Sequence, residues 1–386
     1  MLKGHYQGFL RHHQGQQHYA CHSHHFWPDV TRDAQLAYWD DTARWVDDKW
    51  GHFFTEKVPR VQSHLARLLM LPDPGQLVFA PNTHEFVVRL LSCLPAGRPW
   101  RILTTDSEFH SFTRQCLRLE EAGLAQVVRV PTQPFADFEA RFAAQAQQGG
   151  WDLVFFSQVF FNSGVVAGDI DRLVAAVTDP ETMVVVDGYH GFGALPTDLS
   201  AIAHRAFYLA GSYKYAQGGE GCCFMAVPPG CTLRPVNTGW YAEFGALHQS
   251  REGAVAYADN GMRFAGATFD MSALYRLLAV LDWWQQDGIS IEAVHRHVQQ
   301  LQQRFLAELD AVASPLLHRG QLLARDLGLH GHFLTFVLPD AASTERLADY
   351  LASQGILTDY RGDRLRFGFA PYHELEDIDL KALASL

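Results

Sequence analysis

The sequence has little of several features that would place it in a simple class of protein. Its 386 residues include six cysteines, and two of them are adjacent. So few cysteines in so long a chain do not form the disulfide scaffold of a small secreted domain, and we expect them to be reduced and mostly buried. No internal repeat or low-complexity segment is present, which excludes a repeat architecture. The cysteines are Cys21, Cys93, Cys116, Cys222, Cys223 and Cys231.

Long apolar runs and basic tracts are also missing. No stretch of 18 apolar residues is present, and the N-terminal segment lacks the apolar core of a secretion signal, so we expect a cytoplasmic protein. The formal net charge of −11 would repel nucleic acids and anionic membranes, and neither is expected as a partner. What is present, 48% hydrophobic and 12% aromatic residues, is enough for a large core and a second, smaller domain.

The order of apolar segments predicts an α/β fold. Strand-like and helix-like segments alternate from residue 77 to 227, which favours a mostly parallel, doubly wound sheet that binds its ligand at the carboxyl ends of the strands. Two long amphipathic helices and a strand, helix, strand pattern follow. We therefore expect an N-terminal arm over residues 1–28, a large domain over 29–258, and linking helices with a small C-terminal domain over 259–386.

One stretch, from Val184 to Gly221, carries most of the chemistry. Three valines lead into Asp187, and a buried strand that ends in a carboxylate needs a cation as partner. A second apolar run, from Ala206, delivers Lys214 just before a glycine-rich turn. Taken singly, each residue could equally be a surface lysine or an ordinary strand end.

The pair indicates one cofactor. Pyridoxal phosphate is held as a Schiff base on a lysine amine, and a carboxylate that faces its ring nitrogen keeps the nitrogen protonated, so that the ring acts as an electron sink. Lys214 and Asp187 fit these two roles. We therefore predict a pyridoxal-phosphate enzyme with both residues in its catalytic machinery.

The motifs DGYHGFGALPTDL and SYKYAQGGEG resemble those of the class V aminotransferase family, which are pyridoxal-phosphate enzymes of fold type I. Within that family they are most similar to kynureninases. The resemblance implies a mostly parallel sheet of the seven-stranded type with a smaller C-terminal α+β domain. It also implies a catalytic role for His190, placed where the family has the hydrogen-bonding partner of the ring oxygen.

The resemblance implies further contacts with the cofactor. Thr83 and His84 start a predicted helix whose N–H groups and dipole suit a phosphate, although the same residues would serve as an ordinary helix cap. Phe109 is expected to stack on the ring, with core packing as the alternative. The remaining expected cofactor contacts are Asn162 near the ring oxygen or substrate carboxylate, and Ser212 and Tyr213 at the phosphate.

Substrate contacts and the oligomeric state also follow by resemblance. Arg366 is expected to bind the α-carboxylate of an amino acid, with Arg364 as the alternative, because a guanidinium matches a carboxylate in two hydrogen bonds. Trp240 is expected to contact the substrate or to pack in the core. Thr268 occupies the place of a threonine that binds the phosphate of a neighbouring subunit, which implies a homodimer with shared active sites.

Histidines crowd the N-terminal arm. His18, His22, His24 and His25 surround Cys21, and imidazole and thiolate are zinc ligands. No second group of ligands stands at a matching spacing, so no metal is expected. We hypothesise instead that some of these histidines face the substrate.

We expect an amino acid to be bound through its carboxylate and Lys214 to remove its α-proton. The resemblance favours hydrolytic cleavage of a side-chain bond of the kynureninase type. The alternatives are transamination and β-elimination or another lyase reaction, and, from a different class, a pyridoxal-phosphate-binding protein without catalysis. Cysteine desulfurases of the family use a thiol in their C-terminal part, and no cysteine follows Cys231, which argues against that activity.

Overall fold

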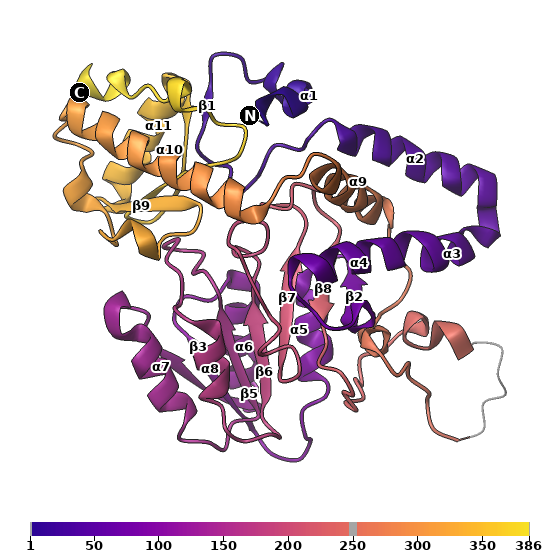
Figure 1. Ribbon diagram of the computed structural model, residues 1–386. Helices are drawn as coiled ribbons and strands as arrows, with labels where there is room; N and C mark the ends of the chain where they lie inside the picture. The colour runs from indigo at the N-terminus through magenta and orange to yellow at the C-terminus, as the bar shows by residue number, and fades with distance from the viewer. Residues whose placement is uncertain (1, 247–252, 386) are drawn as a thin grey trace.

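A seven-stranded sheet lies at the centre of the larger part of the molecule in a computed structural model that describes residues 2–246 and 253–385 (Figure 1). Its strand order is β2, β8, β7, β6, β5, β3, β4. The four pairings from β7 to β4 are parallel, and β8 is antiparallel to both of its neighbours. The strands are β2 (Leu77–Ala80), β3 (Trp100–Thr105), β4 (Ala125–Val130), β5 (Leu153–Ser157), β6 (Met183–Asp187), β7 (Ala206–Gly211) and β8 (Cys223–Ala226).

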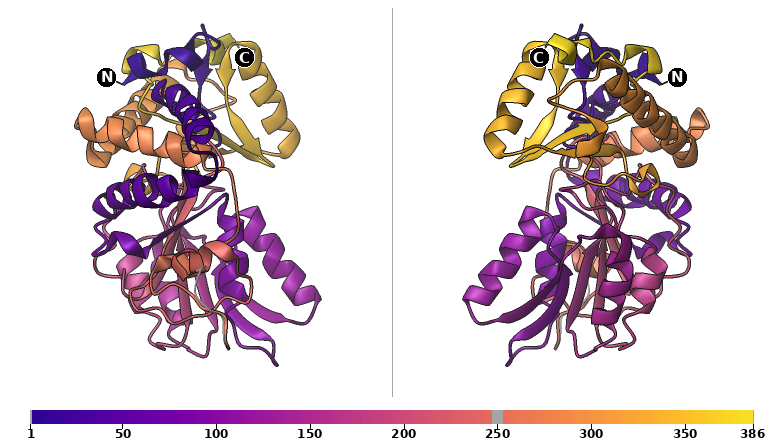
Figure 2. Two further views of the ribbon diagram at one scale, coloured as in Figure 1. Left: turned by 90° about the vertical axis from the view of Figure 1, so that its right-hand side faces the viewer. Right: turned by 90° about the vertical axis from the view of Figure 1, so that its left-hand side faces the viewer.

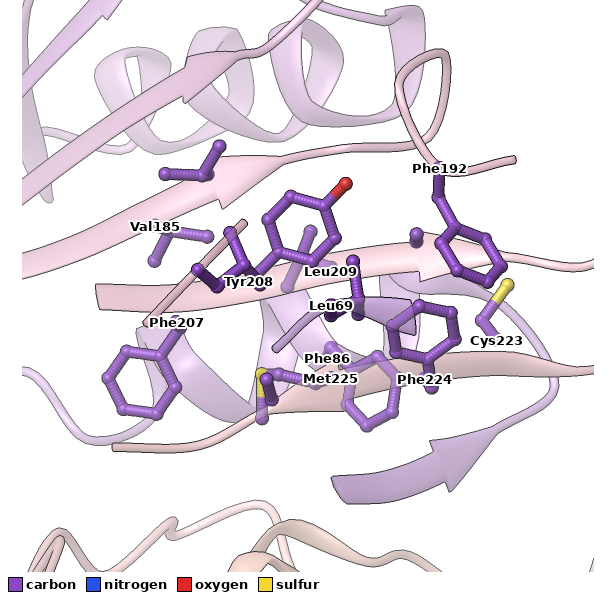
Figure 3. Packing of buried hydrophobic residues seen from close by; sticks show 14 of the residues in the cluster. Leu69, Phe86, Val185, Phe192, Phe207, Tyr208, Leu209, Cys223, Phe224 and Met225 are labelled. Carbon is purple, nitrogen blue, oxygen red and sulfur yellow. The ribbon is translucent and has the colours of Figure 1, made fainter. Parts of the chain in front are cut away.

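The central strands are apolar over most of their length, up to the polar residues at their carboxyl ends, because helices and loops cover both faces of the sheet. Every residue of β5 and β7 is buried, as are the first four residues of β6. Figure 3 shows Phe207, Tyr208, Leu209, Phe224 and Met225 packed together in this core. The helices around the sheet are α4 (Val58–Leu68), α5 (Thr83–Leu91), α6 (His110–Glu121), α7 (Phe138–Ala146), α8 (Ile170–Ala175) and α9 (Ser272–Gln286).

A second, smaller core belongs to the C-terminal part. It is built on an antiparallel sheet with the order β11, β12, β9, which α10 and α11 accompany (Figures 1 and 2). Its elements are α10 (Ile291–Val312), β9 (Phe333–Val337), α11 (Ala341–Ser353), β10 (Ile356–Leu357), β11 (Asp359–Arg361) and β12 (Arg364–Gly368).

The first residues of the chain lie against this C-terminal part, where the indigo and yellow segments meet in Figure 1. After α1 (Gln7–Leu10), the short strand β1 (Gln17–His18) pairs in parallel with β10. Tyr19 is buried in the smaller core, whereas Tyr6 and Phe26 belong to the larger one. The N-terminal segment is thus packed into both cores.

The predicted fold class, an α/β fold with a mostly parallel sheet and a smaller C-terminal α+β part, is confirmed. The helix α2 (Val30–Trp45) ends where Val46 takes a positive φ of 46°, and α3 (Lys49–His52) follows. Across the two described ranges, no helix is both long enough and apolar enough to span a bilayer.

Candidate active site

A cavity of about 400 Å³ opens at the carboxyl ends of β5 and β6 and at the start of α5. It gathers seven of the residues that the sequence predicts to hold the cofactor. These are Thr83, His84, Phe109, Asp187, His190, Tyr213 and Lys214. Residues more than 130 positions apart in the chain therefore meet at one place, as expected for a parallel sheet whose strands end at a common edge.

Lys214 lies in this cavity on the loop after β7 and is only 5% exposed. Its Nζ is 2.5 Å from Nε2 of His190, on the loop after β6. Burial lowers the pKa of Lys214 to about 7, with Asp187 opposing the shift and Arg366 adding to it. Burial likewise holds the pKa of His190 well below its usual value. A large share of the free amine, the form that acts as nucleophile or base, is therefore present at neutral pH.

Asp187 closes β6 and lines the same cavity. One carboxylate oxygen accepts a hydrogen bond of 2.9 Å from the backbone N–H of Tyr189, and the other has no hydrogen bond within the described part of the chain. Burial raises the pKa of Asp187, while the Tyr189 N–H and the charge of Lys214 oppose that rise. The free oxygen is thus available to a cationic group inside the cavity.

The start of α5 supplies an anion site. The Asn82 side chain caps the helix by accepting a 3.0 Å hydrogen bond from the backbone N–H of Glu85. Asn82, Thr83 and His84 all line the cavity, where the positive end of the helix dipole favours a phosphate. Tyr213 also lines it, whereas the buried Ser212 hydroxyl donates a 2.5 Å hydrogen bond to the Gly219 carbonyl and does not.

Aromatic rings form the walls around the lysine. The ring centres of Tyr189, Tyr213 and Phe109 lie 5.1, 5.6 and 5.7 Å from Lys214 Nζ. Phe109 is 37% exposed, which leaves its ring available for stacking rather than fixed in the core.

Arg366, the predicted carboxylate-binding residue, lies behind the cavity wall. It is buried, and it donates hydrogen bonds of 2.7 Å to the Phe161 carbonyl and 2.5 Å to Asp359. Although burial alone would raise it, the pKa of Asp359 is held below its usual value by His22 and Arg366. The alternative, Arg364, is half-buried and donates a 3.0 Å hydrogen bond to the Asn162 carbonyl.

Three other predicted site residues do not line the cavity. Asn162 donates a 3.1 Å hydrogen bond to Ser107, and its buried side-chain oxygen has no hydrogen-bond partner among the residues that the structure describes. Trp240 donates from Nε1 to Thr268 Oγ1 at 3.0 Å, away from Lys214. The roles of these residues stay predictions.

The arm histidines hypothesised to face the substrate differ in how far they are buried. His22 is fully buried, stacks on Phe333 at 4.4 Å and lies 3.4 Å from Asp359, so it contacts the partner of Arg366. His25 is buried, and His24 is exposed. Among the residues described, no three histidine, cysteine, aspartate or glutamate side chains are arranged to hold a metal.

Some residues at the site were not predicted from the sequence. Tyr189, Glu220 and Cys223 line the cavity, and the first could have been found because it lies between Asp187 and His190. Asp359 was also missed. Its pairing with Arg366 across β11 and β12 could have been read from two short strands placed symmetrically about the Gly362 turn.

The residues present fit pyridoxal phosphate. The buried lysine is partly unprotonated, the free Asp187 oxygen suits a protonated ring nitrogen, and the start of α5 suits a phosphate. The cavity is also large enough for a small aromatic cofactor. The fold and the site together therefore define a pyridoxal-phosphate enzyme of fold type I.

Sequence comparison gives the family. The family model described as "Aminotransferase class-V" matches residues 33–380, so the chain belongs to the class V aminotransferase family. Pyridoxal phosphate is the cofactor of this family, and the predicted cofactor and fold are thereby confirmed. A search of curated protein sequences finds no match.

Solved structures share the whole fold. A C-DES mutant with glycine covalently linked to the pyridoxal-phosphate cofactor has a TM-score of 0.83 at 19% identity, over 99% of this chain and 98% of that one. The cystine C–S lyase C-DES with its product cysteine persulfide has a TM-score of 0.79 at 18% identity, over 97% of each chain. The cysteine desulfurase CsdA from Escherichia coli has a TM-score of 0.78 at 16% identity, over 100% and 96%. These are lyases and desulfurases rather than the kynureninases to which the sequence motifs were compared.

Proposed function

We propose that the protein is a lyase that uses pyridoxal phosphate to eliminate a leaving group from the β-carbon of an amino acid. The observation that carries the proposal is the Lys214 amine, buried beside His190 and Asp187 in the cavity with a pKa lowered to about 7. The similarity of the fold to a cystine C–S lyase supports a sulfur leaving group, so L-cystine and L-cysteine are the first substrates to test.

Each site residue has its own role in the proposed elimination. When bound, the cofactor supplies an electron sink for the electron pair left by the α-proton. The Lys214 amine accepts the α-proton, and Asp187 holds positive charge at the ring nitrogen. Thr83 and His84, at the start of α5, hold the phosphate, and Phe109 and Tyr189 exclude water from the amine.

The state of the cysteines favours elimination over desulfurase chemistry that transfers sulfur to a thiolate of the enzyme. Cys223 is the cysteine that lines the cavity, and burial raises the pKa of its thiol to about 12. A thiol with so high a pKa is a poor nucleophile at neutral pH. Elimination needs no such thiol, because the leaving group departs with its own electron pair and takes up a proton.

Hydrolysis of the kynureninase type was the favoured expectation from the sequence, and we now rank it below elimination. Both reactions would begin with the same α-proton transfer to Lys214. The solved structures that share the fold are described as C–S lyases and desulfurases, and this similarity supports the lyase alternative.

Two measurements test the proposal. Purified protein mixed with pyridoxal phosphate should show a visible absorption band that Lys214→Ala lacks, with Lys381→Ala, an exposed lysine, as the control. The loaded enzyme should then release pyruvate and ammonium from L-cystine or L-cysteine. A band without turnover of any amino acid would support the cofactor-binding protein, and amino groups transferred to an added 2-oxo acid would support transamination.

We also propose a homodimer in which Trp240 and Thr268 serve the partner's site. Their mutual hydrogen bond and their place outside the lining of the Lys214 cavity of their own chain support this arrangement. Sedimentation should give twice the chain mass. Mixing and refolding Lys214→Ala with Thr268→Ala subunits should restore part of the activity that each variant lacks, and no recovery would contradict shared sites.

A further inference from the structure

A group of buried and half-buried polar side chains extends from His190, the partner of Lys214, and three of its four members have no role in the function proposed so far. Its members come from four separate parts of the chain: the loop after β6, the loop after β7, α10 and the segment before β9. They are His190, Tyr215, His295 and His332.

Several buried polar atoms of this group are unpaired within residues 2–246 and 253–385. They are His190 Nδ1, Tyr215 Oη and His332 Nδ1, and Nε2 of the neighbouring His25 is in the same state. Leaving such an atom unpaired in the interior destabilises the folded state, so native proteins usually supply a bound water instead. Three such imidazole nitrogens around one tyrosine, whose hydroxyl is the fourth unpaired atom, indicate a hydrated polar pocket rather than a dry core.

The side chains form a continuous series. Lys214 Nζ is 2.5 Å from His190 Nε2, and the rings of His190 and Tyr215 are 6.1 Å apart. The Tyr215 and His332 rings meet edge to face at 5.1 Å. His332 Nε2 is 3.3 Å from Nδ1 of His295, which is half-buried on α10. The series therefore runs from the cavity to the surface of the molecule.

We propose that His190, Tyr215, His332 and His295, with water between them, conduct protons between Lys214 and solvent at α10. The inference rests on the proposed function, since the proton conducted is the α-proton that Lys214 accepts. Burial keeps His190 and His332 neutral at pH 7, so each ring has one N–H and one lone pair, as a relay requires.

One proton passes from Lys214 to solvent through successive transfers between neighbouring groups. The Lys214 ammonium gives a proton to His190 Nε2, and His190 releases its Nδ1 proton through water to Tyr215. Tyr215 accepts at its hydroxyl oxygen and releases its own hydroxyl proton to His332 Nδ1. His332 passes its Nε2 proton to His295 Nδ1, and His295 releases one proton to solvent from Nε2. Every group ends neutral, each imidazole as the other tautomer.

Exchange of an α-proton with solvent tests the path. Enzyme loaded with pyridoxal phosphate is incubated in D₂O with L-alanine, which has no leaving group. NMR then follows the replacement of the α-proton by deuterium. In His295→Ala, exchange should slow by about tenfold, below the range for a group that transfers the proton directly. The isotope effect of α-deuterated alanine should fall, because escape of the proton rather than C–H cleavage becomes slow.

Matched variants separate conduction from structure. His297 lies on the same helix as His295, and its Nε2 donates a hydrogen bond to the His373 carbonyl outside the path, so His297→Ala should exchange the α-proton at the wild-type rate. Added imidazole should restore the exchange rate of His295→Ala and leave the rate of His297→Ala unchanged. Tyr215→Phe keeps the ring and removes the hydroxyl, and should resist this rescue. Equal exchange rates in His295→Ala, Tyr215→Phe and wild type would overturn the path.

A readout independent of activity is the hydration of the pocket. A high-resolution crystal structure of the cofactor-free protein should show ordered water bonded to His190 Nδ1 and Tyr215 Oη, and a dry pocket would overturn the proposal. If wild-type enzyme exchanges the α-proton of no amino acid, the proposed function fails and the path fails with it, whereas equal exchange in wild type and the path variants overturns the path alone.

Discussion

In the active-site cavity, burial shifts the pKa values of Lys214, His190 and Asp187 more than their direct partners do. Lys214 illustrates the effect, because its closest polar contact is a neutral imidazole rather than a carboxylate. Asp187 favours the charged amine, yet burial outweighs it and brings the pKa to about 7. The same loss of water raises the pKa of Asp187. Burial in the cavity thus favours the neutral forms of Lys214 and Asp187 until a ligand of complementary charge binds there.

The lowered pKa of Lys214 predicts how the stability of the cofactor-free protein depends on pH. Between about pH 7 and the ordinary lysine value of 10.5, the unfolded chain holds a proton that native Lys214 has lost. The free energy of unfolding therefore rises with pH in this window, by up to about 1.4 kcal/mol per pH unit, and the gain is lost as the pH falls to 7. Lys214→Met should flatten this rise in urea denaturation. The exposed Lys381→Met should keep it, and identical slopes for both variants would contradict the lowered pKa.

The ion pair between Asp359 and Arg366 makes a second prediction at this scale. Asp359→Asn removes the carboxylate from a buried guanidinium but keeps an oxygen to accept its hydrogen bond, so we expect a loss of about 1–3 kcal/mol of stability. The more positive surroundings should also lower the KM for an amino acid bound by its carboxylate. The exposed Asp363→Asn, in the same hairpin, is the control for denaturation and kinetics. Unchanged stability in Asp359→Asn would mean that the pair contributes nothing.

The positions of site residues were predictable from the sequence where a strand ends. Asp187 and Lys214 follow apolar runs, and both lie in the cavity as expected. Arg366 follows the same reasoning by resemblance, yet Asp359 and the Phe161 carbonyl already occupy its guanidinium. The Phe161 contact joins the hairpin to a distant loop, and no local pattern in the sequence encodes it, whereas the Asp359 contact lies within the hairpin itself.

Among the elements, the loop after β6 depends on a close approach. Gly188 follows Asp187, and a Cβ at this position would overlap the hydroxyl end of the Tyr208 side chain, which is buried in β7. The absence of a side chain lets the chain turn tightly and place Asp187 and His190 in one cavity. The glycine thus fixes the geometry of two site residues without contacting a ligand.

Gly188→Ala should therefore destabilise the protein by about 1–3 kcal/mol, the usual cost of overpacking a core. It should also weaken pyridoxal-phosphate binding, because Asp187 is displaced. Gly51→Ala, in α3, has open space around the added methyl group and should be neutral or slightly stabilising. Chemical denaturation and titration of the visible band measure both effects, and similar behaviour of the two variants would contradict the close approach.

For the whole molecule, the sequence predicted the layers but not how the ends of the chain meet. Alternating apolar and helical segments were sufficient for the parallel sheet. The reversal at β8 and the pairing of β1 with β10 were not foreseen, because both depend on long-range contacts between short strands. The N-terminal residues, which show no periodicity, are held by packing into two separate cores.

Tyr19 tests that packing. Its ring lies 5.4, 5.7 and 5.6 Å from those of Phe305, Phe367 and Phe369, and it is 2% exposed. Tyr19→Ala should cost about 3–5 kcal/mol, as for other large aromatic truncations in a core. Tyr360→Ala, at 37% exposure, should cost far less. Equal midpoints of the two variants in guanidinium would show that the N-terminal segment is not part of the C-terminal core.

The pairing of β1 with β10 also bears on biosynthesis. Gln17 and Tyr19 donate backbone hydrogen bonds to Gly355 and Leu357, which leave the ribosome more than three hundred residues later. At bacterial or eukaryotic rates of elongation this delay is on the order of tens of seconds. Throughout that interval the earliest part of the chain must wait without its native neighbours, so a nascent chain stalled before residue 355 would leave it open to proteases and chaperones.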